Sequence, residues 1–150
     1  MIEVKDLKKS FDDKEVLKGI TTTYEAGKTN LIIGQSGSGK TVMLKTLLGV
    51  HTPDSGQILF DGRDFATLDP NEKRNLRTEM GMVFQGSALF DSMTVEENIG
   101  FPLKMFTKKT NAEIKDRVQE VIDRVKLVDA NKKMPSEISG GMQKRVAIAR

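Results

Sequence analysis

The sequence predicts an α/β fold, and three observations lead to this prediction. A short apolar run over residues 29–33 is typical of a strand buried on both faces. A glycine-rich loop follows this run directly. Residues 40–48 then have a helical composition, and Gly49 is well placed to end that helix. A strand, a loop and a helix in this order, with further strands around them, indicate an α/β protein.

Strands are also expected on both sides of the loop and its helix. Residues 2–8 alternate between apolar and polar side chains, and residues 21–24 are β-branched or aromatic, so both segments are predicted to be strands. Residues 53–60 contain a turn followed by a strand. The Asp61-Gly62 pair that comes next predicts a hairpin.

The second half of the chain is predicted to be more helical, from about residue 85 to residue 137, after a further strand candidate at residues 81–84. The clearest helix covers residues 111–128, and Thr110 with Glu113 supplies a capping box at its start. Six apolar residues recur at helical spacing on one face of this helix, which predicts that the face packs in the core. They are Ile114, Val118, Val121, Ile122, Val125 and Val128.

The composition excludes several classes of function. A chain of 150 residues can bury the core of one domain. The absence of Cys excludes thiolate zinc sites and redox dithiols, and the single His51, expected in a surface turn, excludes a His-rich metal cluster. The net charge of +3 is spread among acidic residues, so no nucleic-acid partner is expected. Because the sequence shows neither a secretory signal nor a membrane-spanning run, we expect a cytoplasmic protein.

Residues 34–41 follow the pattern G-x-x-x-x-G-K-[ST], which predicts a phosphate-binding loop. Its glycines allow backbone N–H groups to converge on phosphate oxygens, and the helix that follows points its positive end at the same anion. Lys40 is placed to reach the β- and γ-phosphates, and the Thr41 hydroxyl can bind Mg²⁺. A flexible Gly/Ser linker is the alternative. The predicted nucleotide-binding residues are Gly34, Gln35, Ser36, Gly37, Ser38, Gly39, Lys40 and Thr41.

A second glycine motif lies near the end of the sequence. Ser139, Gly140 and Gly141 come directly before a helical stretch at residues 144–150. A serine and two exposed glycines at a helix N-terminus predict a second anion site. A plain helix N-cap is the alternative when this motif is considered by itself.

Together, the two motifs resemble those of the ATP-binding cassette (ABC) ATPases. The signature of that family reads Leu-Ser-Gly-Gly-Gln, and the segment from Ile138 to Gln143 departs from it, with Ile in place of Leu and Met142 in place of Gln. The resemblance implies that Ser139, Gly140 and Gly141 of one subunit contact the ATP held by a second subunit.

Three further residues are assigned through the same resemblance. Phe11 occupies the place of the family's aromatic residue that stacks on adenine, and Val16 in the same segment is assigned to the nucleotide site with it. Gln85 resembles the glutamine that binds Mg²⁺, assists catalysis and senses the transporter partner. Taken alone, Phe11 would be interpreted as a core or strand aromatic, and Gln85 as an ordinary polar residue after a strand.

The resemblance also implies the architecture, the cofactors and the partners. It implies a P-loop NTPase core with an antiparallel β part in residues 1–85, a helical subdomain in residues 86–138, and the signature with the start of its helix in residues 139–150. ATP and Mg²⁺ are the implied cofactors. The implied partners are a second ATPase subunit, in a homodimer that encloses two ATP molecules, and membrane permease subunits at the cytoplasmic face of the inner membrane.

The implied function is that of an ATPase subunit that drives a transporter, and several alternatives stand beside it. Residues 84–103 and Met142 most resemble the Mla/Mce-associated phospholipid-transport branch, although importers of other substrates such as amino acids share the Thr-Val-x-Glu-Asn part. A soluble ABC ATPase of DNA repair or translation would show a coiled-coil insertion or tandem cassettes. A GTPase would need Asn-Lys-x-Asp, and residues 131–134 lack the Asp.

Hydrolysis in this family also requires a Walker B strand, which has four apolar residues followed by Asp and a Glu that acts as general base. No segment has this pattern. Residues 58–61 come closest, but Gly62 stands where the Glu would be. We therefore expect the chain to be the front part of a longer ATPase domain, truncated before Walker B and inactive alone, with a non-hydrolysing nucleotide-binding fragment as the alternative.

Overall fold

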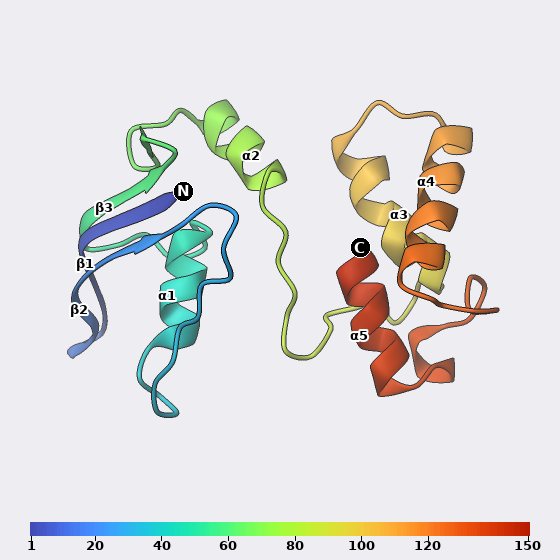
Figure 1. Cartoon of the computed structure of the whole chain (residues 1–150), viewed down its shortest axis with the longest axis horizontal. Helices are drawn as coiled ribbons and strands as arrows, with labels where there is room; N and C mark the ends of the chain where they lie inside the picture. Colours follow the sequence, from blue (N-terminus) through green and yellow to red (C-terminus); the bar gives the residue numbers. More distant parts are fainter. The chain divides into compact units, whose positions relative to one another are not determined.

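The computed structural model describes residues 1–150 and divides the chain into two compact units, residues 1–81 and residues 82–150. Figure 1 labels strands β1, β2 and β3 and the α-helices of both units. Each unit has a hydrophobic cluster of its own, so each is described separately. None of the helices combines the length and the apolar composition that a membrane crossing needs.

The first unit contains a four-stranded antiparallel sheet with the strand order β2-β1-β3-β4 (Figure 1). Its strands are β1 (Ile2–Phe11), β2 (Lys14–Tyr24), β3 (Ser55–Phe60) and β4 (Arg63–Asp64). The strands predicted near the N-terminus and after the turn at 53–56 are thus confirmed. β1 is one of the two inner strands: Val4 lies opposite Thr22 on one side and opposite Ile58 on the other.

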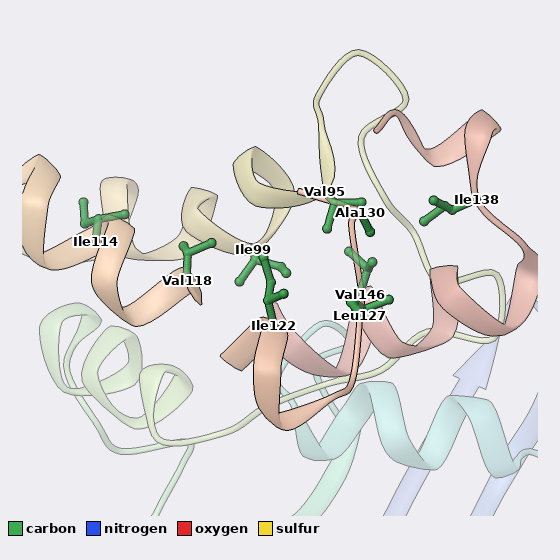
Figure 2. Packing of buried hydrophobic residues seen from close by; sticks show 9 residues of the cluster. All are labelled: Val95, Ile99, Ile114, Val118, Ile122, Leu127, Ala130, Ile138 and Val146. Atoms are coloured by element: carbon green, nitrogen blue, oxygen red, sulfur yellow. The ribbon is translucent and has the colours of Figure 1, made fainter. Parts of the chain in front are cut away.

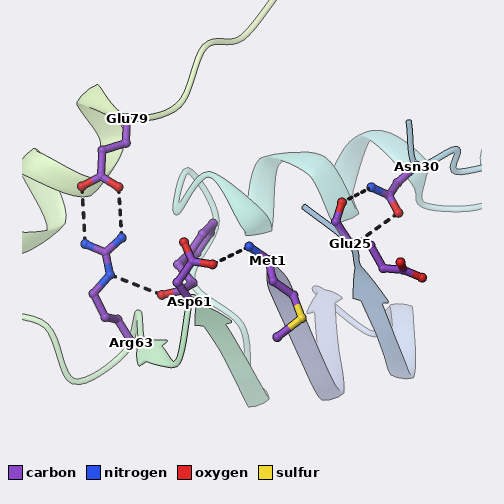
Figure 3. A network of polar contacts seen from close by, with 7 residues as sticks. Met1, Glu25, Asn30, Asp61, Arg63 and Glu79 are labelled. Atoms are coloured by element: carbon purple, nitrogen blue, oxygen red, sulfur yellow. Dashed lines mark hydrogen bonds and ion pairs between the residues drawn. The ribbon is translucent and has the colours of Figure 1, made fainter. Parts of the chain in front are cut away.

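The hairpin predicted at Asp61-Gly62 is confirmed as the connection between β3 and β4. Both turn residues have positive φ angles, 48° and 80°. Two-residue hairpin loops favour this conformation, and Asp followed by Gly adopts it at little cost. The side chain of Asp61 also accepts a hydrogen bond from the N-terminal amine of Met1, so the turn holds the start of β1 (Figure 3).

Helix α1 (Lys40–Leu47) confirms the helix predicted after the glycine-rich loop. Its C-cap is Leu48, and Gly49 follows with φ 67°. A side chain at Gly49 would meet the ring of Phe65 at 2.4 Å, so the close approach requires glycine at this position as well as the backbone angle. The C-terminal end of α1 is therefore fixed by a neighbour from outside the helix.

Helix α2 (Pro70–Thr78) was not predicted, although the sequence carries its start signal. Asp69 accepts hydrogen bonds from the backbone of residues 71 and 72, and the Glu72 carboxylate accepts one from the backbone of Asp69. This is a capping box with Pro70 at the first helical position. The helix has few apolar residues, so periodicity alone does not reveal it.

The core of the first unit lies between the sheet and its helices. Eight buried side chains make up this cluster, and they come from β1, β2, β3, α1 and α2. They are Val4, Leu7, Leu17, Met43, Leu47, Ile58, Phe60 and Leu76. Polar contacts at the surface add further links (Figure 3): the guanidinium of Arg63 pairs with the Glu79 carboxylate, with Nη2 and Oε2 3.0 Å apart.

Two predicted strands are absent from the structure. Residues 29–33 and 81–84 form neither helix nor strand. The side chains of Leu31 and Ile33 are 80% and 81% exposed, and Val83 is exposed as well. The prediction was wrong because an apolar run becomes a buried strand only when another strand pairs with its backbone. No strand of the chain pairs with either segment.

The second unit is helical, and its core is shown in Figure 2. Its elements are α3 (Val95–Phe106), α4 (Asn111–Arg124), the 3₁₀ turn η1 (Pro135–Glu137) and α5 (Gly140–Ala149). The cluster gathers side chains from α3, α4, α5 and the segments between them. They are Val95, Ile99, Ile114, Val118, Ile122, Leu127, Ala130, Ile138 and Val146.

The helix predicted over residues 111–128 is confirmed at its start but ends early, at Arg124. The capping box of Thr110 and Glu113 is present. Lys126 then takes a left-handed φ of 54°, which breaks the helical path. As a result Leu127 enters the core, whereas Val128 is 75% exposed. Val128 was therefore wrongly assigned to the buried face.

Asn98 is the one buried amide in the core of the second unit, and its hydrogen bonds are all local. Its Oδ1 accepts from the backbone N–H of Phe90 at 2.8 Å. Its Nδ2 donates to the carbonyls of Phe90, Met93 and Thr94 at 3.0–3.1 Å. Thr94 and Glu97 form the capping box of α3, so the Thr-Val-x-Glu-Asn segment has a role in the local architecture.

The two capping boxes of α3 and α4 predict a dependence of stability on pH. The pKa of Glu97 and of Glu113 is lowered because each carboxylate accepts hydrogen bonds from the backbone N–H and the hydroxyl of its N-cap threonine. A carboxylate with a lowered pKa stabilises the folded state above its unfolded pKa of about 4.3, and this stabilisation is lost as the pH falls through the folded value.

We therefore expect the double variant Glu97→Gln, Glu113→Gln to lose less stability than the unmodified chain when the pH falls from about 5 to about 3. The measurement is urea unfolding followed by circular dichroism at several pH values. Thr110→Ser, which keeps a hydroxyl at the N-cap, is the control and should retain the original pH dependence. Parallel pH profiles for the double variant and the unmodified chain would contradict this account.

Candidate functional site

The N-terminus of α1 differs from the other α-helix starts in having no side-chain cap. Gly39 is its N-cap residue, and the first turn contains no acidic residue. The remaining α-helices each begin with a side-chain oxygen that accepts a backbone N–H. These acceptors belong to Asp69, Thr94, Thr110 and Ser139. The first backbone N–H groups of α1 therefore have no side-chain acceptor and can bind a group from outside the chain. The partial positive charge at this end of the helix favours an anion.

Lys40 completes this anion-binding arrangement. Its Nζ donates to the carbonyl oxygens of Gly34 and Gln35, at 2.7 Å each. The side chain therefore folds back over the loop that precedes its own helix. Both acceptors are neutral, so they position the ammonium group without cancelling its charge. Residues 34–41, which the sequence singled out, thus combine an uncapped helix start with one cation held at the preceding loop.

The hairpin of β1 and β2 lies against this loop. A side chain at Gly39 would come within 3.1 Å of Val16 Cγ1 and 3.3 Å of the Val16 carbonyl oxygen. Val16 therefore packs directly on the start of α1, and its contact with a nucleotide stays a prediction. Phe11 ends strand β1, pairs with Lys14 at the tip of the same hairpin and is 39% exposed, so of the alternatives the residue alone allowed it is a strand aromatic and not a core one.

Two residues were assigned to Mg²⁺, and they belong to different units. Thr41 is exposed in the first turn of α1, with its hydroxyl free to bind a cation. Gln85 is exposed in the second unit, so its approach to Thr41 remains a prediction. The chain gathers no group of three or more His, Cys, Asp or Glu residues. A magnesium ion at Thr41 would take its other ligands from phosphate oxygens and water.

At the signature motif, the N-cap and the exposed glycines occur together. Ser139 Oγ accepts a hydrogen bond from the backbone N–H of Met142 at 3.3 Å, so the residue is the N-cap of α5. Its hydroxyl proton is still available to donate. Gly140 and Gly141 are exposed, and no neighbouring atom lies within 3.4 Å of the Cβ position of either. This helix start can still meet an external anion.

The departures from the family's signature have a structural explanation. Ile138 is buried in the core of the second unit, where an apolar residue of either kind fits. Met142 packs against the same cluster. Gln143 does not replace the missing glutamine, because its Nε2 donates to the Pro135 carbonyl at 2.9 Å within the subunit.

Sequence reasoning missed two arginines that hold the signature helix in place. Arg145 donates to the carbonyls of Val125 and Lys126, at 3.3 and 2.7 Å, and so caps the end of α4. Arg150 donates to the Ala88 carbonyl at 2.6 Å. Both contacts join residues that are far apart in the sequence, and no spacing or motif in the sequence predicts them.

The comparisons with known proteins agree with this geometry. The profile of a family described as "ABC transporter" matches residues 17–150. The chain belongs to the ABC transporter family. Within that family it is an ATP-binding domain, and its α/β fold is that of a P-loop NTPase.

Curated relatives of this ABC domain have several different names. It is 44% identical to the "Probable ribonucleotide transport ATP-binding protein mkl" of Mycobacterium leprae, over 99% of this chain and 43% of that protein. It is also 44% identical to the spermidine/putrescine import ATP-binding protein PotA of Nitrosomonas europaea, over 100% of this chain and 40% of that protein. The chain thus spans less than half the length of these relatives.

Solved ABC cassettes have the same fold. A bacterial ABC transporter cassette in a dimeric structure aligns with a TM-score of 0.88 at 30% identity, covering 99% of this chain and 68% of that one. A dimeric cassette in a post-hydrolysis state with ADP and Pi aligns with a TM-score of 0.86 at 29% identity, over the same shares.

The contact between Val16 and Gly39 predicts different outcomes for two glycine substitutions. Both Gly37 and Gly39 have positive φ, but nothing lies within 4 Å of a side chain at Gly37. We expect Gly39→Ala to lower the free energy of unfolding by about 1–3 kcal/mol, because a strained backbone and the Val16 contact add together. Gly37→Ala is the matched control and should cost less. Chemical denaturation measures both, and equal losses would show that the hairpin does not press on the loop.

Proposed function

We propose that this chain is the ATP-binding part of an ABC transporter subunit and that it holds ATP with Mg²⁺ at residues 34–41. The observation that supports this most directly is the start of α1, which has no side-chain cap and carries Lys40 folded over the preceding loop. In a capped helix, a side-chain oxygen already accepts a hydrogen bond from one of the first backbone N–H groups. In α1 these N–H groups are free of such a cap and lie beside a positioned cation, an arrangement suited to binding a polyphosphate.

Each residue of the site has a specific task in this proposal. The backbone N–H groups at the start of α1 donate to phosphate oxygens, and Lys40 adds a positive charge beside them. The Thr41 hydroxyl binds Mg²⁺, which supplies charge neutralisation at the β- and γ-phosphates when it is bound. Phe11 offers its exposed surface to the adenine ring.

The proposal extends to the assembly. Ser139, Gly140 and Gly141 of one copy would face the ATP of a second copy in a homodimer. Gln85 would contact the metal and assist catalysis, while the helical second unit would contact permease subunits at the cytoplasmic face of the membrane. The dimeric neighbours among solved cassettes support the pairing of two copies. The exposed glycines at the start of α5 are consistent with a contact made by another subunit.

We further propose phospholipid as the substrate of the complete transporter. The support is the similarity of residues 84–103 and of Met142 to the phospholipid-transport branch. The Thr-Val-x-Glu-Asn part does not contribute, because importers of other substrates share it. Some relatives are named for the transport of ribonucleotide or of spermidine and putrescine, so these substrates are the alternatives. The test is transfer of labelled phospholipid between vesicles by the complete transporter, and ATP-dependent uptake of spermidine instead would refute the assignment.

The Lys40 contacts predict a loss of nucleotide binding in Lys40→Ala. Removing a charged donor from a phosphate site costs about 1.5–3 kcal/mol, so ATP affinity should fall about tenfold to a hundredfold or more. Isothermal titration calorimetry with ATP and Mg²⁺ measures this. Lys45→Ala, in the last turn of the same helix, is the control and should bind normally. Equal affinities for the Lys40 variant and the unmodified chain would refute the site.

We also propose that this chain alone binds ATP without hydrolysing it, because no carboxylate follows an apolar strand in the position of a general base. The expected phosphate release stays at the background level, even at protein concentrations that saturate ATP. Turnover above that of the Lys40→Ala variant would show that the chain contains a base that the sequence motif does not reveal.

A further inference from the structure

Phe11 is held by two neighbours and is still open over part of its surface. The His51 ring meets the Phe11 ring in a T-shaped arrangement, with centroids 5.1 Å apart and planes at 78°. The ammonium group of Lys9 lies 5.4 Å from the Phe11 centroid. The side chain of Phe11 nevertheless remains 39% exposed. Two side chains therefore contact the ring, and part of its surface stays open to solvent.

Asp54 fixes the backbone beside this ring. Its carboxylate accepts hydrogen bonds from the backbone N–H of Ser10 at 2.6 Å and from Lys9 Nζ at 2.7 Å. Its own backbone N–H donates to the Lys8 carbonyl at 2.9 Å. These bonds continue the pairing of β1 with β3 beyond Lys8 and Ser55, where the strand ladder ends. The residue just before Phe11 is thus tied to the loop that contains His51.

His51 is in turn fixed to the helix of the phosphate loop. The backbone N–H groups of Val50 and His51 both donate to the Lys45 carbonyl, at 2.9 and 3.3 Å. Lys45 lies in the last turn of α1, and the phosphate loop lies at the first turn. One helix therefore carries the phosphate-binding end and the support of the aromatic ring. His51 is half-buried, whereas the sequence predicted a surface residue.

We propose that His51 is a positioning residue for the base of the nucleotide: its edge-to-face contact holds the Phe11 ring in the orientation in which the exposed surface can stack on adenine. This inference rests on the proposed function. A phenylalanine at the tip of a hairpin samples several rotamers, and a ligand that stacks on it must order the ring. The T-shaped contact orders the ring before the ligand arrives.

The test compares ATP with inorganic triphosphate, both with Mg²⁺, by calorimetry on the complete chain. His51→Ala should weaken ATP binding about threefold to tenfold, the cost of ordering one side chain, and should leave triphosphate binding unchanged. In a Phe11→Ala background the same substitution should have no further effect on ATP, because the ring it positions is gone.

A conservative variant and a neighbouring control sharpen the result. His51→Phe keeps an aromatic ring edge and should restore ATP affinity, whereas His51→Leu, which fills the space without an aromatic edge, should not. Thr52→Ala, next to His51 and exposed, should bind both ligands normally. Because His51→Leu retains most of the side-chain volume, it also serves as the test should His51→Ala fail to fold.

Each outcome supports or overturns the inference. Unchanged ATP affinity in His51→Ala or His51→Leu overturns it. Equal weakening of ATP and triphosphate also overturns it, because that pattern indicates damage to the phosphate loop. An additive loss in the Phe11→Ala background has the same consequence. If the unmodified chain and Lys40→Ala bind ATP equally, the proposed function itself fails, and this result is distinguishable from all of the others.

Discussion

The first backbone N–H groups of every helix need hydrogen-bond acceptors, and this requirement affects both units of the protein. In four α-helices a side-chain oxygen at the N-cap accepts such a hydrogen bond, and it comes from Asp, Thr or Ser. Helix α1 has no such cap, and its start is the place where the chain can accept an anion. The same physical requirement therefore separates helices that complete the architecture from the helix that offers a binding site. The start of α5 combines the two, since its serine caps the helix while exposed glycines leave room beside it.

Strand β1 connects the segments that lie around the phosphate loop. Its pairing with β2 creates the hairpin that carries Phe11 at its tip and Val16, which packs on Gly39, in its second strand. Its pairing with β3, extended by Asp54, brings the segment after α1 next to the same tip. The backbone hydrogen bonds of β1 thus position Phe11 and the segment after α1, whereas Val16 reaches the glycine-rich loop by packing against Gly39.

Features set by local chemistry could be predicted from the sequence. The helix after the glycine-rich loop, the Asp61-Gly62 hairpin and the capping box of Thr110 each depend on a few neighbouring residues, and the structure contains all three. The signature serine was expected either as an anion site or as an N-cap. The structure shows the N-cap and leaves the glycines exposed.

Features set by distant partners could not be predicted. The apolar run at residues 29–33 has the composition of a strand, but a strand exists only through its pairing. The helix over residues 111–124 ends where Lys126 turns left-handed and Arg145 caps the carbonyls, and Arg145 comes from another helix. Phe11 and His51 are forty positions apart, so no local pattern announces their contact. The family resemblance suggested that Phe11 stacks on adenine, but it gave no indication that His51 contacts Phe11.

The presence of two separate hydrophobic clusters has a thermodynamic consequence. Where the two clusters unfold as separate cooperative units, the chain has two transitions and a single melting temperature does not describe it. In that case a ligand held entirely within residues 34–41 raises only the transition of the first unit through mass action and leaves the second in place. The calorimetric trace of the ligand-saturated chain therefore assigns a binding event to one half of the molecule.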